Sequence, residues 1–160
     1  MADFNMRKIL LNALAGVNAH IKPMNVLEDL DIETAGKEIK NSPYTIWQIL
    51  KHINYWQEKF ISYVKDENTP PALTAKEGWS FSKSPLTEEE FKDEIKKFSD
   101  SMDKANNFTD EELNKKAQRY KSGYNVLQAM ASHISYHIGE IVLLRRIIGN
   151  WPPPTGGDTW

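Results

Sequence analysis

Four histidines are the residues of this chain whose type and spacing point most directly to chemistry. His133 and His137 share one helix face, because they are four residues apart and each residue of an α-helix advances by about 100°. Met130 and Ile141 lie on the same face, which indicates that both imidazoles project toward the interior. An imidazole in an apolar interior needs a hydrogen-bond partner or a metal ion. The pair therefore predicts a two-ligand metal clamp, with hydrogen-bonded core histidines as the alternative.

A third ligand would have to come from another helix. His52 lies at the margin of the apolar stripe of the second predicted helix, one turn before Trp56. His20 lies within the apolar stripe of the first predicted helix, near the end of that helix. Either side chain can reach the pair on the fourth helix, and spacing alone does not choose between them.

Motifs of the common metalloenzyme and hydrolase classes are absent from the sequence. The chain contains no His-Glu-x-x-His of zinc proteases and no Glu-x-x-His of ferritin-like di-iron bundles. It also lacks a glycine-rich phosphate loop and a Gly-x-Ser-x-Gly elbow. Because the chain has no cysteine, any thiol chemistry must use an external thiol. The residues thus indicate a metal site without indicating a reaction.

A few other side chains are weaker candidates for the site. Glu140 lies three residues after His137 and can act as a base or bind a substrate, although a solvated or supporting carboxylate is the commoner role. Tyr136 can donate to a bound anion, but tyrosines of helical bundles usually serve packing. Trp56 and His20 are expected to line the pocket beside the metal.

Length and composition favour a single globular domain over residues 1–160. Hydrophobic residues make up 40% of the 160 residues, charged residues 26%, and the formal net charge is -2. No window approaches the roughly 20 apolar residues needed to cross a bilayer, and the near-neutral charge argues against an extended nucleic-acid surface. The apolar run after Arg7 is interrupted too early for a signal peptide, so we expect a cytoplasmic protein.

Four long segments have the apolar period of α-helices, which predicts an all-α four-helix bundle. The first segment ends at Lys22-Pro23, and the second begins with Ser42-Pro43 as N-cap and first helical residue. The third begins with the capping-box pattern Thr87–Glu90. The fourth runs from about residue 124 to 148, and the charges of Arg145-Arg146 near its end complement the helix dipole.

The connections between these helices are long. Residues 66–85 are rich in Pro, Gly and Ser and have no clear period, which is typical of a crossover loop. Short helical turns are expected at residues 25–29 and after Thr109. The tail, residues 150–160, contains two tryptophans, and we expect it to pack back onto the body.

Two of the helical segments resemble the DinB/YfiT-like superfamily. One is SPYTIWQILKHIN, which begins at Ser42 and is followed by Trp56. The other is SHISYHIGE, which begins at Ser132 and is followed by Arg145, Gly149 and Trp151-Pro152. The resemblance covers nearly the whole chain, including Ala-His at residues 19–20 and the final GGDTW. Its most specific feature is the histidine pair at this distance from the single histidine.

The resemblance implies a fold and a ligand set. The fold would be a four-helix bundle with up-down-down-up topology. His52, His133 and His137 would be the metal ligands, typically for zinc or nickel. Characterised members of the superfamily include metal-dependent transferases that use low-molecular-weight thiols such as bacillithiol or glutathione, and a mycothiol-dependent isomerase. Many members have no known activity, so the resemblance implies the site more firmly than the reaction.

Such a ligand set has a clear chemical meaning. Three neutral imidazoles suit zinc, nickel, copper or ferrous iron, and they leave a coordination position open, as catalytic sites do. The ion would lower the pKa of a bound water to about 7 or deprotonate a bound thiol. We therefore expect a metal-dependent enzyme, a transferase or hydrolase, that activates a small thiol or water.

The alternative is a non-catalytic metal- or ligand-binding stress protein. In either case we expect the protein to bind a small molecule and to bind neither a nucleic acid nor a membrane. The sequence does not decide whether the protein forms a homodimer through an apolar helix face.

Overall fold

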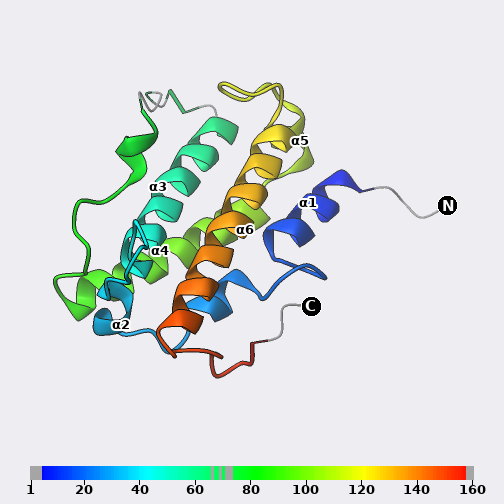
Figure 1. Ribbon diagram of the computed structural model, residues 1–160. Helices are drawn as coiled ribbons and strands as arrows, with labels where there is room; N and C mark the ends of the chain where they lie inside the picture. The colour runs from blue at the N-terminus through cyan, green and yellow to red at the C-terminus, as the bar shows by residue number, and fades with distance from the viewer. Residues whose placement is uncertain (1–4, 66, 69, 71–73, 158–160) are drawn as a thin grey trace.

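The computed structural model describes residues 5–65, 67–68, 70 and 74–157. All regular elements in these residues are helical, which confirms the predicted all-α class (Figure 1). In chain order they are α1 (Met6–Leu14), η1 (Pro23–Leu27), α2 (Ile32–Gly36), α3 (Ile46–Val64), η2 (Ala75–Gly78), α4 (Glu88–Asn106), α5 (Asp110–Asn114) and α6 (Gly123–Ile147). None of these helices is long and apolar enough to cross a membrane.

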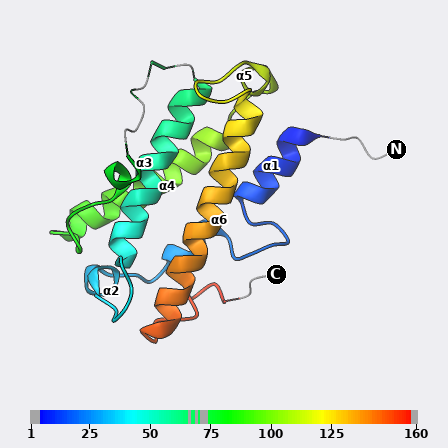
Figure 2. The same cartoon turned by 45° about the horizontal axis from the view of Figure 1, so that its top comes forward.

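Helix α6 is the central element of the fold. It packs against both α1 and α3, and α3 packs in turn against α4 (Figures 1 and 2). Fully buried apolar side chains fill these interfaces, among them Leu50 and Ile53 of α3, Phe98 of α4, and Met130 and Ile134 of α6. Because each helix buries one apolar stripe, the arrangement places a face of α3 directly against a face of α6.

Capping residues set where the helices of this core begin. Helix α3 starts at Ile46, later than predicted, because Thr45 and Gln48 form a reciprocal capping box. The Ser42 hydroxyl, expected as the cap, instead donates to the carbonyl of Tyr44 at 2.7 Å. The predicted capping box of α4 is confirmed in part: the side chain of Thr87 accepts from the N–H of Glu90, but the Glu90 carboxylate accepts from the N–H of Leu86 instead of Thr87.

Helix α1 is shorter than the sequence predicted. The apolar period continues to Ile21, but the helix ends at Leu14. Two residues with positive φ follow, Gly16 at 75° and Asn18 at 59°, and they turn the chain away from the helix axis. A Cβ on Gly16 would lie 2.6 Å from the His20 ring, so the turn also depends on the absence of a side chain there. His20 therefore lies in a turn and not on a helix.

Arg145 near the end of α6 has a role that the sequence did not reveal. Arg145 lies in the last turn of α6, as expected, but the helix dipole does not suffice to explain it, because only 1% of this residue is exposed. Its Nη1 donates to the carbonyls of Val26 at 2.6 Å and Glu28 at 2.9 Å, and its Nε donates to Asn150 at 2.9 Å. One side chain thus ties α6 to η1 and to the chain that follows α6.

The described part of the tail lies against the body. Trp151 packs against the core, and the backbone N–H and hydroxyl of Thr155 both donate to the Glu28 carboxylate. The second tail tryptophan, Trp160, lies outside the described residues.

The Arg145 contacts predict a large effect on stability. Arg145→Ala should lower the free energy of unfolding by about 3 kcal/mol, because three backbone carbonyls lose a charged donor in a buried setting. Arg146→Ala is a matched control, since Arg146 is exposed and also lies over the Trp151 ring, at 5.3 Å compared with 5.7 Å for Arg145. The control should change stability by less than about 0.5 kcal/mol in urea unfolding followed by circular dichroism. Equal losses in the two variants would contradict this role.

Candidate metal centre

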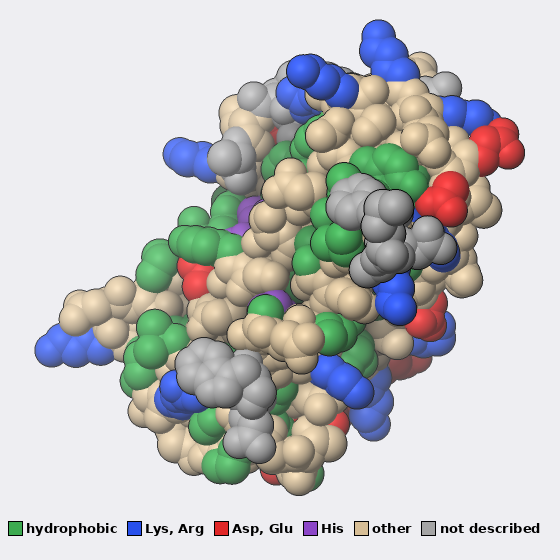
Figure 3. Space-filling view, turned by 90° about the vertical axis from the view of Figure 1, so that its right-hand side faces the viewer, with side chains coloured by type: hydrophobic (Ala, Val, Ile, Leu, Met, Phe, Trp, Pro, Cys, Tyr) green, Lys and Arg blue, Asp and Glu red, His purple; other side chains and the backbone are tan. Residues whose placement is uncertain are grey.

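The structure brings His52, His133 and His137 together at the interface of α3 and α6. One ring nitrogen from each residue lies within 4.8 Å of the other two. His52 is 6% and His137 5% exposed, and His133 is partly buried. Consistent with this burial, little histidine surface is visible on the face shown in Figure 3. The group forms because α3 and α6 bury facing sides. The side of α6 carries His133 and His137 one turn apart, and the side of α3 carries His52.

Hydrogen bonds fix the orientation of two of the three rings. Nδ1 of His137 lies 2.7 Å from Oε2 of Glu140, one turn further along α6. Nδ1 of His52 lies 3.1 Å from the carbonyl of Gly78. Both partners are acceptors, so each Nδ1 carries the proton and each Nε2 keeps a free lone pair. This pattern, with a carboxylate or carbonyl behind the imidazole, is the one that metal-binding histidines usually show.

The spacing of one pair of the remaining nitrogens matches that of ligands on a tetrahedral ion. Nε2 of His52 and Nε2 of His133 are 3.3 Å apart. A tetrahedral ion with metal–nitrogen distances of about 2.0–2.1 Å separates its ligand nitrogens by roughly 3.3 Å. Nδ1 of His133 is buried and has no hydrogen-bond partner among the described residues, so packing and the contact at Nε2 hold this ring. The group could therefore hold a divalent metal, and the imidazole donor set favours a transition metal over calcium or magnesium.

The environment keeps two of the histidines in the neutral form that binds metals. The pKa of His52 is lowered from an ordinary 6.5 to about 4, mainly by burial and also by the nearby His137, while the hydrogen bond to the Gly78 carbonyl partly offsets both effects. Burial lowers the pKa of His133 to about 3, again with contributions from the two neighbouring histidines. At neutral pH these two rings are therefore unprotonated, and a metal ion does not have to displace a proton from them.

A stack of aromatic rings covers one side of the histidine group. The Trp79 indole lies parallel to the His52 imidazole, with centroids 3.8 Å apart and an interplanar angle of 12°. Tyr44 stacks on the other face of that indole at 3.5 Å. Trp56 and Phe60 approach the rings of the group from α3, at 6.3 and 5.9 Å from His133. The sequence suggested Trp56 as a wall of the site, but it did not indicate Trp79, Tyr44 or Phe60.

The loop that carries Trp79 is tied to the start of α3. Gln48 donates from Nε2 to the carbonyl of Ser80 at 2.8 Å, and Thr45 donates from its hydroxyl to the carbonyl of Lys83 at 2.7 Å. Gly78 comes so close to the site that a Cβ on it would lie 2.8 Å from Trp56 Nε1 and 2.9 Å from the His52 ring. The one sequence signal for this contact was Trp79 itself, a single tryptophan directly after a glycine in an otherwise polar loop.

His20 does not join the group, so its expected place beside the metal is wrong. Its Nε2 lies 2.9 Å from the hydroxyl of Ser135, and its Nδ1 lies 2.8 Å from the carbonyl of Ile21. Ser135 is two residues from both His133 and His137, or about 200° around α6. His20 thus contacts the opposite side of the helix, where α1 packs, because the turn after α1 directs it there.

The two weak catalytic candidates lie beside His137. Glu140 accepts a hydrogen bond from that histidine, which is the role of a supporting carboxylate. Tyr136 is 66% exposed, and its ring meets the His137 ring edge-on at 4.9 Å. It is therefore not a packing residue of the core, and a catalytic role for either side chain stays a prediction.

Comparison with protein families gives a clear result. The model described as DinB family matches residues 3–159. Searches of curated proteins and of solved structures found no match. The chain therefore belongs to the DinB family, which confirms the resemblance seen in its sequence. Membership of this family and a buried three-histidine group are together compatible with a metal-binding enzyme.

The lowered histidine pKa values predict how the metal-free protein responds to acid. As the pH falls below about 6.5, His52 and His133 take up protons in the unfolded chain but not in the folded one. Their contribution to the free energy of unfolding is therefore complete above pH 6.5 and is lost as the pH falls toward about 4 and 3. Urea unfolding with a chelator present, at several pH values from 7.5 to 4, would measure this slope.

His133→Leu provides the comparison for that experiment. It removes one of the two histidines whose pKa is lowered, and it places an apolar side chain of similar size in the same interface. The variant should lose less stability between pH 6.5 and 4 than the wild type does, whereas the carboxylates titrate in both. Identical pH profiles would contradict the account of His133 as a buried neutral imidazole.

Proposed function

We propose that this protein is a metal-dependent enzyme in which His52, His133 and His137 hold a divalent ion, zinc or nickel. When bound, such an ion supplies Lewis-acid chemistry that activates a small nucleophile, either a thiol cofactor or water. The observation that carries the proposal is the donor set itself. In the described residues the group contains three histidines and no carboxylate, which suits a catalytic site with an open position better than a closed structural site.

The surrounding residues support this use of the site. Glu140 and the Gly78 carbonyl hold the Nδ1–H groups of His137 and His52, which leaves the Nε2 atoms of both rings available to bind an ion. Trp79 fixes the plane of His52 by stacking and excludes water from that side. A group of this kind needs little rearrangement to bind an ion, because burial already keeps His52 and His133 neutral.

The proposed nucleophile comes from outside the chain. The sequence contains no cysteine and no Gly-x-Ser-x-Gly elbow, so these two common covalent nucleophiles are absent from it. Thiol-using members of the superfamily favour a low-molecular-weight thiol, such as bacillithiol, over water. A transferase is therefore the leading assignment, and a hydrolase is the second.

A non-catalytic binding protein is the competing function. The burial of His52 and His137 and the stack of Trp79 over His52 favour it, because they restrict access to the group from that side. In this case the protein would bind the metal, or a metal and a ligand, without turnover. The two functions differ in one result, the presence of a metal-dependent reaction.

The transferase assignment predicts a metal-dependent transfer of a thiol to an electrophile. With 1-chloro-2,4-dinitrobenzene, the thiolate sulfur would form a bond to the ring carbon, chloride would leave with the bonding electrons, and the thiol proton would pass to solvent. The zinc- or nickel-loaded protein should accelerate this reaction for at least one thiol in a panel that includes bacillithiol and glutathione. His133→Ala should return the rate to the uncatalysed background, because a ligand is lost.

His20→Ala is the matched control, since it removes a histidine that contacts the other side of α6. This control should keep the wild-type rate. If the loaded wild type and His133→Ala give equal rates across a broad thiol panel, the transferase assignment fails. Metal-dependent hydrolysis or binding without turnover would then be the better description.

A further inference from the structure

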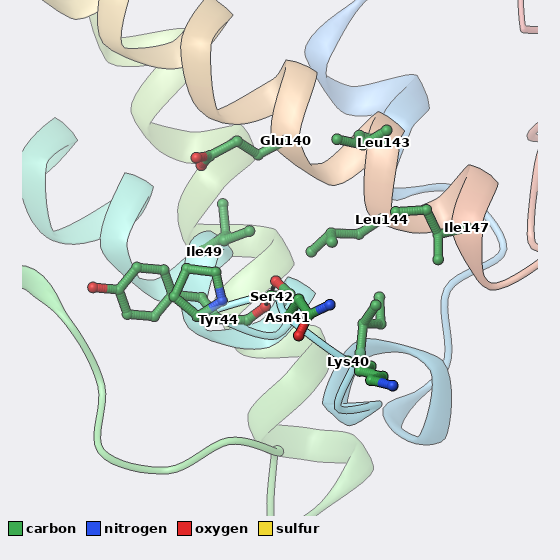
Figure 4. Close-up of a pocket in the computed structure, with 11 residues that line it drawn as sticks. Lys40, Asn41, Ser42, Tyr44, Ile49, Glu140, Leu143, Leu144 and Ile147 are labelled. Atoms are coloured by element: carbon green, nitrogen blue, oxygen red, sulfur yellow. Dashed lines mark hydrogen bonds between the residues drawn. The ribbon is translucent and has the colours of Figure 1, made fainter.

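A pocket of about 350 Å³ lies beside the histidine group and is not part of it. It lies between α6 and the segment that leads into α3 (Figure 4). Ile49, Leu143, Leu144 and Ile147 give it largely aliphatic walls. Two of these residues, Leu143 and Ile147, are 58% and 59% exposed although they are large and apolar. A cavity of this volume is suited to a small molecule, and its walls would lose exposed apolar surface when one binds.

Charge is distributed unevenly in this pocket. The Glu140 side chain lies at one end, and Lys40 lies at the other (Figure 4). Lys40 is exposed, so it contributes little to binding. Glu140 is partly buried, and its Oε2 accepts from His137 Nδ1. Within the part of the chain that the structure describes, its Oε1 has no hydrogen bond and can accept one from a ligand. The end near Glu140 therefore favours a hydrogen-bond donor with positive charge.

The pocket is also connected to the histidine group at several points. Glu140 lines the pocket and bonds His137. Tyr44 lines it and stacks on Trp79, which itself stacks on His52. A molecule in this pocket would therefore lie next to the proposed metal centre, with its charged end toward the residue that supports His137.

We propose that this pocket binds small apolar molecules that carry a protonated amine. The aliphatic walls hold the apolar part, and Glu140 accepts a hydrogen bond from the ammonium group. If the neighbouring centre is catalytic, such a molecule is its substrate; that clause rests on the proposed function. Binding itself needs only the pocket, so it can be tested on the protein without metal.

Three probes of equal chain length test the proposal: hexylamine, hexanol and hexanoate. Titrations of metal-free protein, followed by calorimetry and by two-dimensional NMR, should show that hexylamine binds most tightly. Its advantage over hexanoate should be about fivefold, the upper end of what one partly exposed ion pair provides. Glu140→Gln should reduce the affinity for hexylamine to about that for hexanol, because the amide keeps the size of the side chain but carries no negative charge.

Two asparagine variants test the location. Ile147→Asn should weaken all three probes, because it makes one wall of the pocket polar. Ile9→Asn is the matched control: Ile9 is an isoleucine on helix α1 with 51% exposure, outside the pocket, and this variant should bind like the wild type. The absence of binding, equal affinity for the three probes, or equal effects of the two variants would each overturn the proposal.

These results are separate from those that test the proposed function. If hexylamine binds as expected but no thiol is transferred, the pocket is retained and the transferase assignment fails. If thiol transfer occurs but hexylamine does not bind, the pocket proposal fails while the metal-dependent reaction stands.

Discussion

The site depends on one constraint, which is that three imidazoles are buried facing one another where α3 meets α6. Two of their nitrogens are only 3.3 Å apart, and the low-dielectric surroundings disfavour a proton on His52 and His133. Neutral rings in such a place still have polar nitrogens that need partners. Glu140 and Gly78 satisfy two of the outward nitrogens, and the inward nitrogens are left for a cation or for one another. The demand for partners thus explains both the loop over the site and the carboxylate behind it.

The rest of the fold keeps the two helices in the position that this constraint requires. Helix α6 is packed on both sides, and Arg145 attaches its C-terminal half to the carbonyls of Val26 in η1 and Glu28 just after it. At the start of α3, Gln48 serves twice, because its side chain closes the capping box and also donates to the loop that carries Trp79. The interactions that begin a helix therefore also place a wall of the site. Such sharing means that the geometry of the histidines cannot vary independently of the core.

Much of the fold and part of the site could be predicted from the sequence. Residues on long periodic helices were located well: the spacing of His133 and His137 placed them on one inward face, and Thr87 marked the start of α4. Failures occurred where a local signal was outweighed by backbone conformation or by a distant partner. The apolar period continues past Leu14, but Gly16 and Asn18 turn the chain there. His20 therefore contacts the side of α6 opposite to His133 and His137.

Other parts of the site had no signal that the sequence could show. Trp79 lies in a loop, where no period predicts which way a side chain points, and its position is set by carbonyls that bond to residues far away in the sequence. Arg145 looked like an ordinary helix-end cation because its partners are backbone carbonyls, which have no residue signature. The choice of His52 over His20 likewise needed either the family resemblance or the structure. Contacts between distant segments account for all three cases.

The central claim is that His52, His133 and His137 form one metal site and that His20 is not part of it. Its most direct test is the metal content of tag-free protein after dialysis against zinc, measured by elemental analysis. The account predicts a single zinc ion per chain in the wild type and in His20→Ala, and none in His137→Ala. A wild type without zinc, or the same loss in both variants, would contradict it.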